Sequence, residues 1–304
     1  MFLPTLKTPI LGLEVNFILM IKQMLFAFIS TAIIFVACSS QKAEIKDSIT
    51  RSSSSFSADS AIESKYLNKV MRFKIILPST YNSLDSLPLI YLLHGYGGNE
   101  NSYHNYLSGL QKLADSLAIL VVCVNGETSW YVNSIERDSL RYEDYLVKEL
   151  IPFVDGHYKV GKTNKQHGIA GLSMGGFGSL FLAFKHPTLF SYVGGSSACV
   201  DLKPYPENWG IKKIFGDVLL NEKVYEQHSP YYMVDSISKE SLKFKLVLDC
   251  GTEDFFFQDN QRFDKKLNDL GIKHDYFTTK GDHNWAYWRV SIPNHLKRFA
   301  AEVK

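Results

Sequence analysis

Three continuous apolar runs constrain the fold of this chain more than any other feature. They read LPLIYLLHG at 87–95, AILVVCVNG at 118–126 and FKLVLDCG at 244–251, and each ends at a glycine. Strands that are buried on both faces of a parallel sheet have this pattern, whereas strands with one face in water alternate apolar and polar residues. The runs therefore predict a mostly parallel central sheet that is covered on both sides.

Amphipathic stretches separate the apolar runs, as expected for helices that connect parallel strands. The candidate strands are 70–77, 87–94, 118–124, 167–172, 192–195, 244–249 and 275–279, and the candidate helices are 103–117, 138–158, 174–185, 260–270 and 286–303. This alternation predicts an α/β fold, a three-layer α/β/α sandwich. Residues 201–242 lie between two strands and are less apolar than their neighbours, so we expect an insertion over the functional site.

The N-terminal residues differ from the rest of the chain. Residues 24–38 read MLFAFISTAIIFVAC, an uncharged run that Lys22 precedes, and this is the pattern of a secretory signal peptide. The run is shorter than the roughly 20 residues that a helix needs to span a bilayer. We therefore expect residues 1–37 to be a signal peptide. A further apolar run precedes Met20, which suggests that translation truly starts at Met20 or Met24.

The end of this segment, FVACSS, resembles the lipobox of bacterial lipoproteins, in which cleavage exposes a cysteine that is then lipidated. The resemblance assigns lipidation to Cys38 and predicts an exported lipoprotein, anchored to a membrane in the periplasm or at the cell surface. An ordinary secreted protein and an uncleaved anchor are the alternatives. Residues 38–61 are rich in serine and show no period, so we expect a flexible tether ahead of one domain at 62–304.

Charge and cysteine content exclude several classes of function. The 33 Lys and Arg residues nearly balance the 31 Asp and Glu residues, which gives no electrostatic footprint for nucleic acid. Cys123, Cys199 and Cys250 lie in or beside strand-like runs, and no CxxC spacing occurs. We expect these three to be small buried hydrophobic residues rather than metal ligands or members of a disulfide framework.

The strongest chemical motif is GLSMGG at 171–176, which follows an apolar strand and precedes a helix. G-x-S-x-G in this context is typical of a nucleophile elbow, a sharp strand-to-helix turn that would present Ser173 as a nucleophile. Side chains at 171 and 175 would collide across such a turn. The following helix N-terminus offers free N–H groups to a developing oxyanion. The alternative is a glycine-rich helix start with a bystander serine.

A serine nucleophile needs a base that accepts its proton and an acid that orients the base. In this type of fold both follow the serine, the acid first and the histidine second. His283, in the polar turn GDHNW between the last strand and the last helix, is the predicted base. Asp254, in the loop after the strand at 244–249, is the predicted acid. Glu253 is the neighbouring alternative, while Asp249 still lies within the strand.

The fourth element is LLHGYGG at 92–98, which follows a strand and resembles the glycine-rich oxyanion loop of esterases. Glycines let the backbone bend so that an N–H group can point at the substrate oxygen. The predicted oxyanion donors are the backbone N–H groups of Tyr96 and Met174. We expect His94 to brace the loop rather than to act as a base. The alternative is a plain turn after a strand.

Five motifs in this order resemble the esterase D and feruloyl esterase family of α/β-hydrolases, which includes the antigen 85 mycolyltransferases. They are LLHGYGG, SWYVNS with the following RYEDYLVKELIPFVD, GLSMGGFGSL, DCGTEDFF and GDHNWAYW. The resemblance implies the α/β-hydrolase fold, hydrolysis of carboxylic esters without a metal or cofactor, and the triad Ser173, Asp254 and His283. The stretch 201–242 matches no motif of the family.

Aromatic residues make up 13% of the chain, and several of them fall in loops near the predicted site. Aromatic rings provide flat apolar walls for sugars or phenolic acyl groups. Trp130, Tyr131 and Trp285 are the predicted substrate contacts, whereas we expect Trp288, on the last helix, to pack in the core. No cluster of Lys or Arg occurs in these loops, which favours a neutral ester as substrate.

These observations predict an exported serine esterase that removes feruloyl or acetyl groups from polysaccharides such as xylan, or from their oligosaccharides. An S-formylglutathione hydrolase or another thioesterase is an alternative, although an export signal disfavours a cytoplasmic thioester. Acyl transfer to a sugar or lipid alcohol is a further alternative. An alternative of another class is a non-catalytic cell-surface binding protein that keeps the fold, and the intact set of three site residues argues against it.

Overall fold

The computed structural model describes residues 57–304. The predicted signal peptide, the lipidation site Cys38 and residues 38–56 of the predicted tether lie outside the described residues. Within the described part, no helix has both the length and the apolar character that crossing a lipid bilayer requires.

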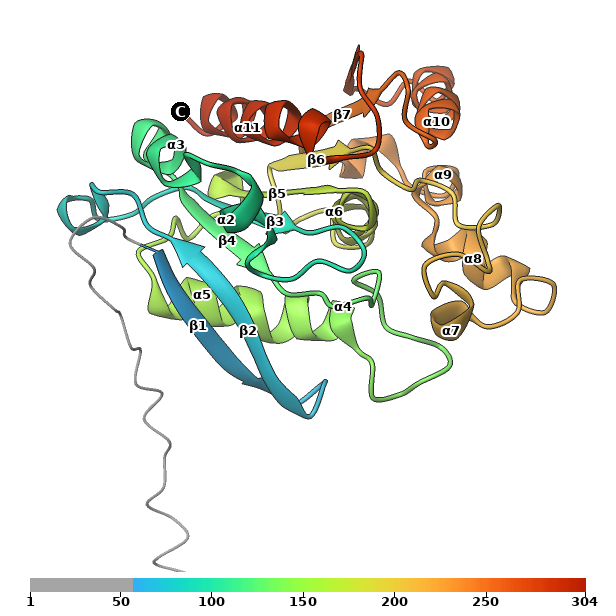
Figure 1. The fold of residues 1–304 in the computed structure, drawn as a ribbon, viewed down its shortest axis with the longest axis horizontal. Helices are drawn as coiled ribbons and strands as arrows, with labels where there is room; N and C mark the ends of the chain where they lie inside the picture. Colours follow the sequence, from blue (N-terminus) through green and yellow to red (C-terminus); the bar gives the residue numbers. More distant parts are fainter. Residues whose placement is uncertain (1–56) are drawn as a thin grey trace, which may run out of the picture. The chain divides into compact units, whose positions relative to one another are not determined.

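An eight-stranded sheet forms the centre of the fold, in the order β1-β2-β4-β3-β5-β6-β7-β8 (Figure 1). The strands are β1 (Ser57–Ser64), β2 (Lys69–Ile76), β3 (Leu89–Leu93), β4 (Leu120–Val124), β5 (His167–Leu172), β6 (Tyr192–Ser196), β7 (Lys245–Gly251) and β8 (Asp275–Thr279). β2 is antiparallel to both of its neighbours, and every pair from β4 to β8 is parallel. The predicted mostly parallel sheet is confirmed.

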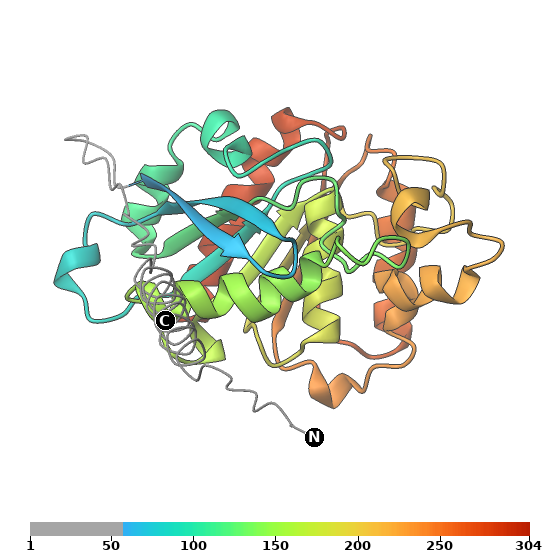
Figure 2. The ribbon, with the colours of Figure 1, turned by 90° about the horizontal axis from the view of Figure 1, so that it is seen from below.

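Helices cover both faces of the sheet (Figures 1 and 2). One face carries α2 (Ser102–Tyr106), α3 (Leu110–Leu117) and α11 (Trp285–Glu302). The other carries α4 (Tyr142–Asp144), a π-helical segment (Tyr145–Leu150), α5 (Ile151–His157), α6 (Met174–Lys185) and α10 (Phe257–Asp269). Short 3₁₀ turns occur at Tyr81–Ser83, Asn164–Gln166 and Lys239–Ser241. The three-layer α/β/α sandwich is therefore confirmed.

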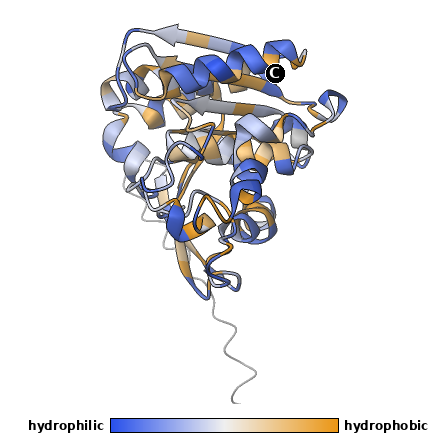
Figure 3. Cartoon of the chain, turned by 90° about the vertical axis from the view of Figure 1, so that its right-hand side faces the viewer, coloured by the Kyte–Doolittle hydropathy of each residue, from blue (hydrophilic) through white to orange (hydrophobic). Residues whose placement is uncertain are grey.

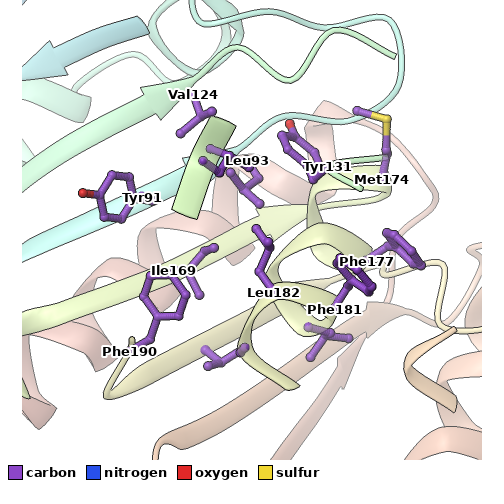
Figure 4. Packing of buried hydrophobic residues seen from close by; sticks show 14 of the residues in the cluster. Tyr91, Leu93, Val124, Tyr131, Ile169, Met174, Phe177, Phe181, Leu182 and Phe190 are labelled. Carbon is purple, nitrogen blue, oxygen red and sulfur yellow. The ribbon is translucent and has the colours of Figure 1, made fainter. Parts of the chain in front are cut away.

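The apolar runs are continuous because both faces of each strand are buried. In β3, Leu89, Tyr91 and Leu93 belong to the core on the α6 side, whereas Ile90 and Leu92 belong to the core on the α11 side. Successive side chains of a strand point to opposite faces, so a strand between two helical layers needs apolar residues at every position. Figure 4 shows part of the α6-side core. The helices carry hydrophilic residues beside hydrophobic ones, as helices with one buried face do (Figure 3).

The predicted start of the folded domain at residue 62 is wrong. Residues 57–64, SADSAIES, form β1, which pairs with β2 over eight residues. Alternate residues are buried: Ala58, Ser60 and Ser64 are at most 8% exposed. This serine-rich stretch at the sheet edge resembles a linker in composition, although the burial of alternate residues is typical of a strand.

Two predicted helices are interrupted in the structure. The helix expected at 103–117 is divided into α2 and α3 at Gly109, whose φ of +96° is a left-handed conformation that favours glycine. The helix expected at 138–158 begins only at Tyr142 and contains the π-helical segment before α5. The helix predicted at 174–185 agrees with α6 at both ends.

Residues 201–242, the predicted insertion, belong to the long connection between β6 and β7. It contains α7 (Lys212–Phe215), α8 (Glu222–His228) and α9 (Pro230–Met233). Buried residues such as Phe215 and Tyr225 attach it to the core on the α6 side.

Candidate active site

Ser173 stands at the junction of β5 and α6 with a strained backbone. Its φ is +55° and its ψ is −120°, a conformation that L-residues rarely adopt. The backbone N–H of Ser173 donates to the carbonyl oxygen of Ser196 on β6 at 2.9 Å, and its own carbonyl accepts from Phe177 in the first turn of α6 at 3.0 Å. The sharp turn predicted from the G-x-S-x-G motif is thus present, and Ser173 is partly exposed at its tip.

The glycines that flank Ser173 are required by close backbone contacts. A Cβ atom on Gly175 would lie 1.9 Å from the carbonyl oxygen of Leu93. A Cβ atom on Gly171 would lie 2.3 Å from the carbonyl oxygen of Gly175. Because main-chain atoms cannot move aside as a flexible side chain can, only glycine fits at both positions. These contacts are the physical reason for the spacing of the motif.

The structure brings Ser173, His283 and Asp254 into one hydrogen-bonded series. His283 Nε2 lies 2.9 Å from Ser173 Oγ. His283 Nδ1 lies 2.8 Å from Asp254 Oδ2 and 3.0 Å from Oδ1. A proton on Nδ1 that is donated to the carboxylate leaves Nε2 free to accept the Ser173 proton, which is the arrangement of a nucleophile, a base and an orienting acid.

Asp254 is well fixed for the role of an orienting acid. Its side chain is fully buried, and Oδ1 also accepts a hydrogen bond from the backbone N–H of Phe256 at 2.8 Å. Glu253, the alternative acid, instead lies near Lys280, 3.6 Å from its Nζ, on the exposed side of the loop. Asp249 is directed toward His295, 2.6 Å away, rather than toward His283.

The predicted oxyanion donors, Tyr96 and Met174, come from the loop after β3 and from the start of α6. Met174 is the first residue of α6, and the first N–H groups of a helix have no carbonyl partner within it. Tyr96 belongs to the loop after β3, which lines the same pocket as Ser173. Gly97 in that loop has a φ of +77°, so its left-handed turn favours glycine.

His94 braces this loop, as the sequence predicts. It is 1% exposed; its Nδ1 donates to the carbonyl of Gly95 at 2.8 Å, and its Nε2 accepts from the backbone N–H of Gly126 at 3.0 Å. Both ring nitrogens are thus engaged by the main chain. Burial lowers the pKa of His94 to about 4, so the ring is neutral at pH 7.

A pocket of about 490 Å³ opens at Ser173 and His283. Its lining comes from the oxyanion loop, α2, the nucleophile elbow, the insertion, the Asp254 loop and the start of α11. The lining residues are Gly95, Tyr96, Gly97, Gly98, Asn99, Ser102, Asn105, Tyr106, Leu172, Ser173, Trp209, Phe255, His283, Trp285 and Trp288. None of them is Asp, Glu, Lys or Arg, so the pocket suits an uncharged ligand.

A continuous arc of aromatic rings borders this pocket, with His283 in the middle. Neighbouring ring centroids lie between 4.2 and 5.7 Å apart along the series Tyr106, Trp285, Trp288, His283, Phe255 and Trp209. Tyr106 stacks on Trp285 at one end, and Trp209 stacks on Phe255 at the other. Both ends offer flat apolar faces.

Two of the three predicted substrate contacts are wrong. Trp130 and Tyr131 are 1% and 0% exposed, and both have positive φ values, +57° and +60°. Both rings belong to the core on the α6 side, where Tyr131 donates to the carbonyl of His94 at 2.9 Å (Figure 4). The third predicted contact, Trp285, does line the pocket.

Trp288 has the predicted place in the core and also reaches the pocket. It is 7% exposed, its Nε1 donates to Ser197 Oγ at 3.2 Å, and its ring contacts His283 edge to face. Trp209 and Phe255 also line the pocket, and neither is among the predicted substrate contacts. Phe255 follows Asp254 directly, and Trp209 is the one tryptophan of the predicted insertion. Both positions could therefore have been predicted from the sequence as pocket residues.

The described residues contain no group of three or more His, Cys, Asp and Glu residues that is placed to hold a metal ion. Cys123, Cys199 and Cys250 are free and buried, as expected. Burial raises the pKa of the Cys123 thiol to about 12, so this thiol is neutral at pH 7.

Residues 64–299 match the family Esterase, whose description reads "Putative esterase". An acetyl esterase of Caldicellulosiruptor saccharolyticus is 27% identical over 224 residues, which are 69% of this chain and 82% of that protein. The S-formylglutathione hydrolase of Bos taurus is 25% identical over 256 residues, 76% of this chain and 88% of that protein. The substrate-bound structure of FphF, a fluorophosphonate-binding serine hydrolase of Staphylococcus aureus, has a TM-score of 0.73 and 26% identity, covering 80% of this chain and 98% of that one.

Proposed function

Since the chain belongs to the Esterase family, we propose that it hydrolyses carboxylic esters through Ser173, Asp254 and His283, and that its natural substrates are feruloyl or acetyl esters of polysaccharides or oligosaccharides. The observation that carries the proposal is the series Asp254–His283–Ser173, with contacts of 2.8 and 2.9 Å, at a pocket with an uncharged lining.

In the first half of the reaction, Ser173 Oγ attacks the ester carbonyl carbon while His283 Nε2 accepts its proton. Asp254 holds the Nδ1–H tautomer and stabilises the imidazolium that forms. The backbone N–H groups of Tyr96 and Met174 stabilise the negative charge on the carbonyl oxygen; one such donor contributes about 10²–10³ in rate. His283 then returns the proton to the leaving alcohol, and the acyl group remains on Ser173.

In the second half, water takes the place of the alcohol. His283 accepts a proton from the water as it attacks the acyl-enzyme carbonyl, and the same N–H groups stabilise the second tetrahedral intermediate. The proton returns to Ser173 Oγ when the acid product leaves. Ser173, His283 and Tyr96 line the pocket, whereas Met174 directly follows Ser173 and Asp254 bonds His283.

The pocket chemistry supports an acylated carbohydrate rather than a charged ester. Its volume of about 490 Å³ lies within the roughly 300–1,000 Å³ of small-molecule sites. Aromatic rings bind the apolar faces of sugars and of phenolic acyl groups, and the pocket carries such rings at both ends of its arc. The acetyl esterase relative supports acetyl as one of the acyl groups.

S-Formylglutathione is the second candidate substrate, because one relative carries that activity in its name. Glutathione bears two carboxylates and an ammonium group at neutral pH. A site that binds a charged ligand normally supplies opposite charges or hydrogen-bond partners to it. The lining of this pocket has no Lys or Arg for the carboxylates and no Asp or Glu for the ammonium group, so we rank this thioester below the neutral esters.

The reaction is tested with 4-nitrophenyl acetate and the full-length chain in detergent. We expect saturable release of 4-nitrophenol by the wild-type chain and its loss in Ser173→Ala, with unchanged thermal unfolding of the variant. Turnover by Ser173→Ala at the wild-type rate would exclude Ser173 as the nucleophile and overturn the proposed mechanism.

The substrate is tested by three matched assays on one preparation: release of ferulate from feruloylated arabinoxylan oligosaccharides, release of acetate from acetylated xylo-oligosaccharides, and hydrolysis of S-formylglutathione. We expect one or both carbohydrate esters to have a higher kcat/KM than the thioester. Activity on S-formylglutathione together with failure on both carbohydrate esters would reverse the ranking.

We also propose that the chain is an exported lipoprotein anchored through Cys38. The uncharged run at 24–38 and the FVACSS sequence at its end support this location. Metabolic labelling with a palmitate analogue should mark the wild-type chain and should fail in Cys38→Ala. A wild-type chain that takes up no label would remove the anchor from the proposal without affecting the esterase activity.

A further inference from the structure

We infer that Trp209, held in place by Trp130, forms with Phe255 the wall that binds the leaving alcohol of the ester, and that this wall selects alcohols that carry an uncharged ring. The inference rests on the proposed esterase function and adds which part of the substrate the insertion recognises. It also gives Trp130 a positioning role in place of the predicted direct contact.

Trp209 is the residue through which the insertion reaches the pocket wall. Its ring stacks on Phe255 with centroids 5.7 Å apart and an interplanar angle of 16°, and it contacts Phe256 edge to face at 5.5 Å. Phe256 is buried, whereas Phe255 is 53% exposed at the pocket. Trp209 therefore packs against the acid loop and enlarges the flat surface that Phe255 presents.

The backbone at Trp209 is in a conformation that needs external support. Its φ is +46°, which is unusual for a bulky L-residue, and Gly210 after it has a φ of +68°. The indole Nε1 of Trp130 donates to the carbonyl oxygen of Trp209 at 3.1 Å. Trp130 is almost fully buried, so its packing fixes the N–H donor, and the hydrogen bond holds the strained turn.

Trp130 in turn is fixed by the helix that carries the nucleophile. Its ring packs edge to face on Phe177 at 5.2 Å, and Phe177 lies one helical turn after Ser173 on α6. Trp130 thus connects the nucleophile helix to the insertion. A change at Trp130 should reach the substrate through Trp209, because Trp130 itself does not line the pocket.

The position of Phe255 beside His283 identifies the part of the substrate that this wall meets. His283 Nε2 must return a proton to the leaving-group oxygen, so the alcohol lies next to the imidazole. Phe255 is the closest aromatic neighbour of His283, with centroids 4.2 Å apart. Trp288 also flanks His283 but is only 7% exposed, so Phe255 offers the larger free face.

Two isomeric esters separate the alcohol side from the acyl side. Benzyl acetate carries its ring in the alcohol, and methyl phenylacetate carries the same ring in the acyl group. Methyl acetate lacks a ring and serves as the reference substrate. The full-length chain and its variants are compared by kcat and KM on all three, after thermal unfolding has shown that each variant is folded.

Trp209→Ala should lower kcat/KM for benzyl acetate by about tenfold, mainly through KM, because a stacking surface is lost. Its effect on methyl phenylacetate and methyl acetate should be smaller than its effect on benzyl acetate, because neither carries a ring in the alcohol. Phe255→Leu should give the same pattern and provides a second variant outside the strained turn. Trp130→Phe keeps a buried ring but removes the N–H donor. We expect it to lower kcat/KM for benzyl acetate by about threefold, with a smaller effect on the other two esters.

The matched control for Trp130→Phe is Tyr192→Phe. Tyr192 is also buried, and its hydroxyl bonds His295 at 2.8 Å, away from this pocket. It should leave the ratio of the two isomers unchanged. The double variant Trp130→Phe/Trp209→Ala should lose no more than Trp209→Ala alone, because Trp130 acts through Trp209.

The outcomes distinguish this inference from the proposed function. A wild-type chain that hydrolyses none of the three esters would reject the esterase function and the inference with it. Activity of the wild type with equal losses on both isomers in Trp209→Ala would overturn the inference alone. A loss confined to methyl phenylacetate would also overturn it, because the wall would then bind the acyl group.

Discussion

Asp249 on β7 and His295 on α11 form a buried pair. His295 Nε2 lies 2.6 Å from Asp249 Oδ2, and the two residues are 1% and 8% exposed. Tyr287, on the same helix as His295, donates its hydroxyl to Asp249 Oδ1 at 2.8 Å. The pair therefore ties α11, whose preceding loop carries His283, to β7, whose following loop carries Asp254.

The environment of Asp249 keeps its carboxyl ionised. Burial raises the pKa of this group, but the charge and hydrogen bond of His295 and the hydroxyl donors outweigh burial, and the pKa lies below its ordinary value. Asp249 resembles an orienting acid because it is a buried carboxylate that bonds a histidine. It differs from Asp254 because it bonds a histidine that is remote from Ser173.

We expect Asp254→Asn and Asp249→Asn to fail in different ways. Asp254→Asn removes the carboxylate that fixes the His283 tautomer, so kcat should fall by about 10⁴-fold with little change in stability. Asp249→Asn removes a buried carboxylate that bonds His295 and Tyr287, so the free energy of unfolding should fall by about 1–3 kcal/mol. The folded fraction of Asp249→Asn should keep kcat within about tenfold. Urea unfolding and kcat with 4-nitrophenyl acetate, measured on the same preparations, separate the two effects.

Glu253→Gln is the matched control, because Glu253 precedes Asp254 on the exposed side of the same loop. It should change neither kcat nor stability by more than about twofold and 0.5 kcal/mol respectively. Wild-type kcat in Asp254→Asn, together with a loss of about 10³-fold or more in either of the other variants, would assign the acid to a different residue.

The glycines of the nucleophile elbow permit a second test. Gly175→Ala places a Cβ atom 1.9 Å from the carbonyl oxygen of Leu93, so the main chain must shift. We expect a loss of about 4 kcal/mol or more in unfolding free energy, together with loss of activity. Gly156→Ala, on α5, is the control, since a Cβ there meets nothing within 4 Å. That helical substitution should stabilise the chain by roughly 0.5–1 kcal/mol.

Thermal unfolding and soluble yield of the two glycine variants decide this prediction. Equal stability of Gly175→Ala and the wild type would mean that the elbow can relax, and that the close contact with Leu93 does not restrict residue 175 to glycine.

The three residues of the hydrogen-bonded series were accessible from sequence because each follows a strand with a recognisable pattern. The turn at Ser173 needs glycines at fixed spacing, and this pattern can be recognised in a short stretch of sequence. Asp254 and His283 lie in turns after the last two strands, where the parallel order of the sheet brings strand ends to one edge. Local chemistry and chain order were therefore sufficient for these three positions.

The substrate walls depend on contacts that no local pattern contains. Trp130 and Tyr131 resemble exposed loop aromatics in sequence, yet both have positive φ values and both rings are buried. Trp209 depends on a hydrogen bond from Trp130, 79 positions away, and on ring contacts with Phe255 and Phe256. The serine-rich composition of β1 (Ser57–Ser64) is that of a linker, so the strand was not predicted, although it pairs with β2. Each error concerns a residue whose position depends on a distant partner.

His94 must be neutral to make both of the hydrogen bonds that hold the oxyanion loop. This requirement makes the stability of the fold sensitive to acid. His94 Nδ1 donates to Gly95 and its Nε2 accepts from Gly126, so protonation of Nε2 would break the second hydrogen bond. Burial lowers its pKa to about 4, whereas the histidine of an unfolded chain titrates near 6.5. Between these two values the unfolded chain binds a proton that the folded chain does not bind.

The folded state should therefore lose stability as the pH falls through this window. From pH 7 to pH 5, we expect His94 to lower the free energy of unfolding by about 2 kcal/mol. His94→Gln keeps an oxygen that can accept the Gly126 N–H but has no group that titrates in this range, so its loss should be smaller by that amount. Urea unfolding of both proteins at the two pH values measures the difference, with the variant at pH 7 giving the cost of the substitution itself. Equal losses in the two proteins would contradict the prediction, because another group would then account for the acid sensitivity.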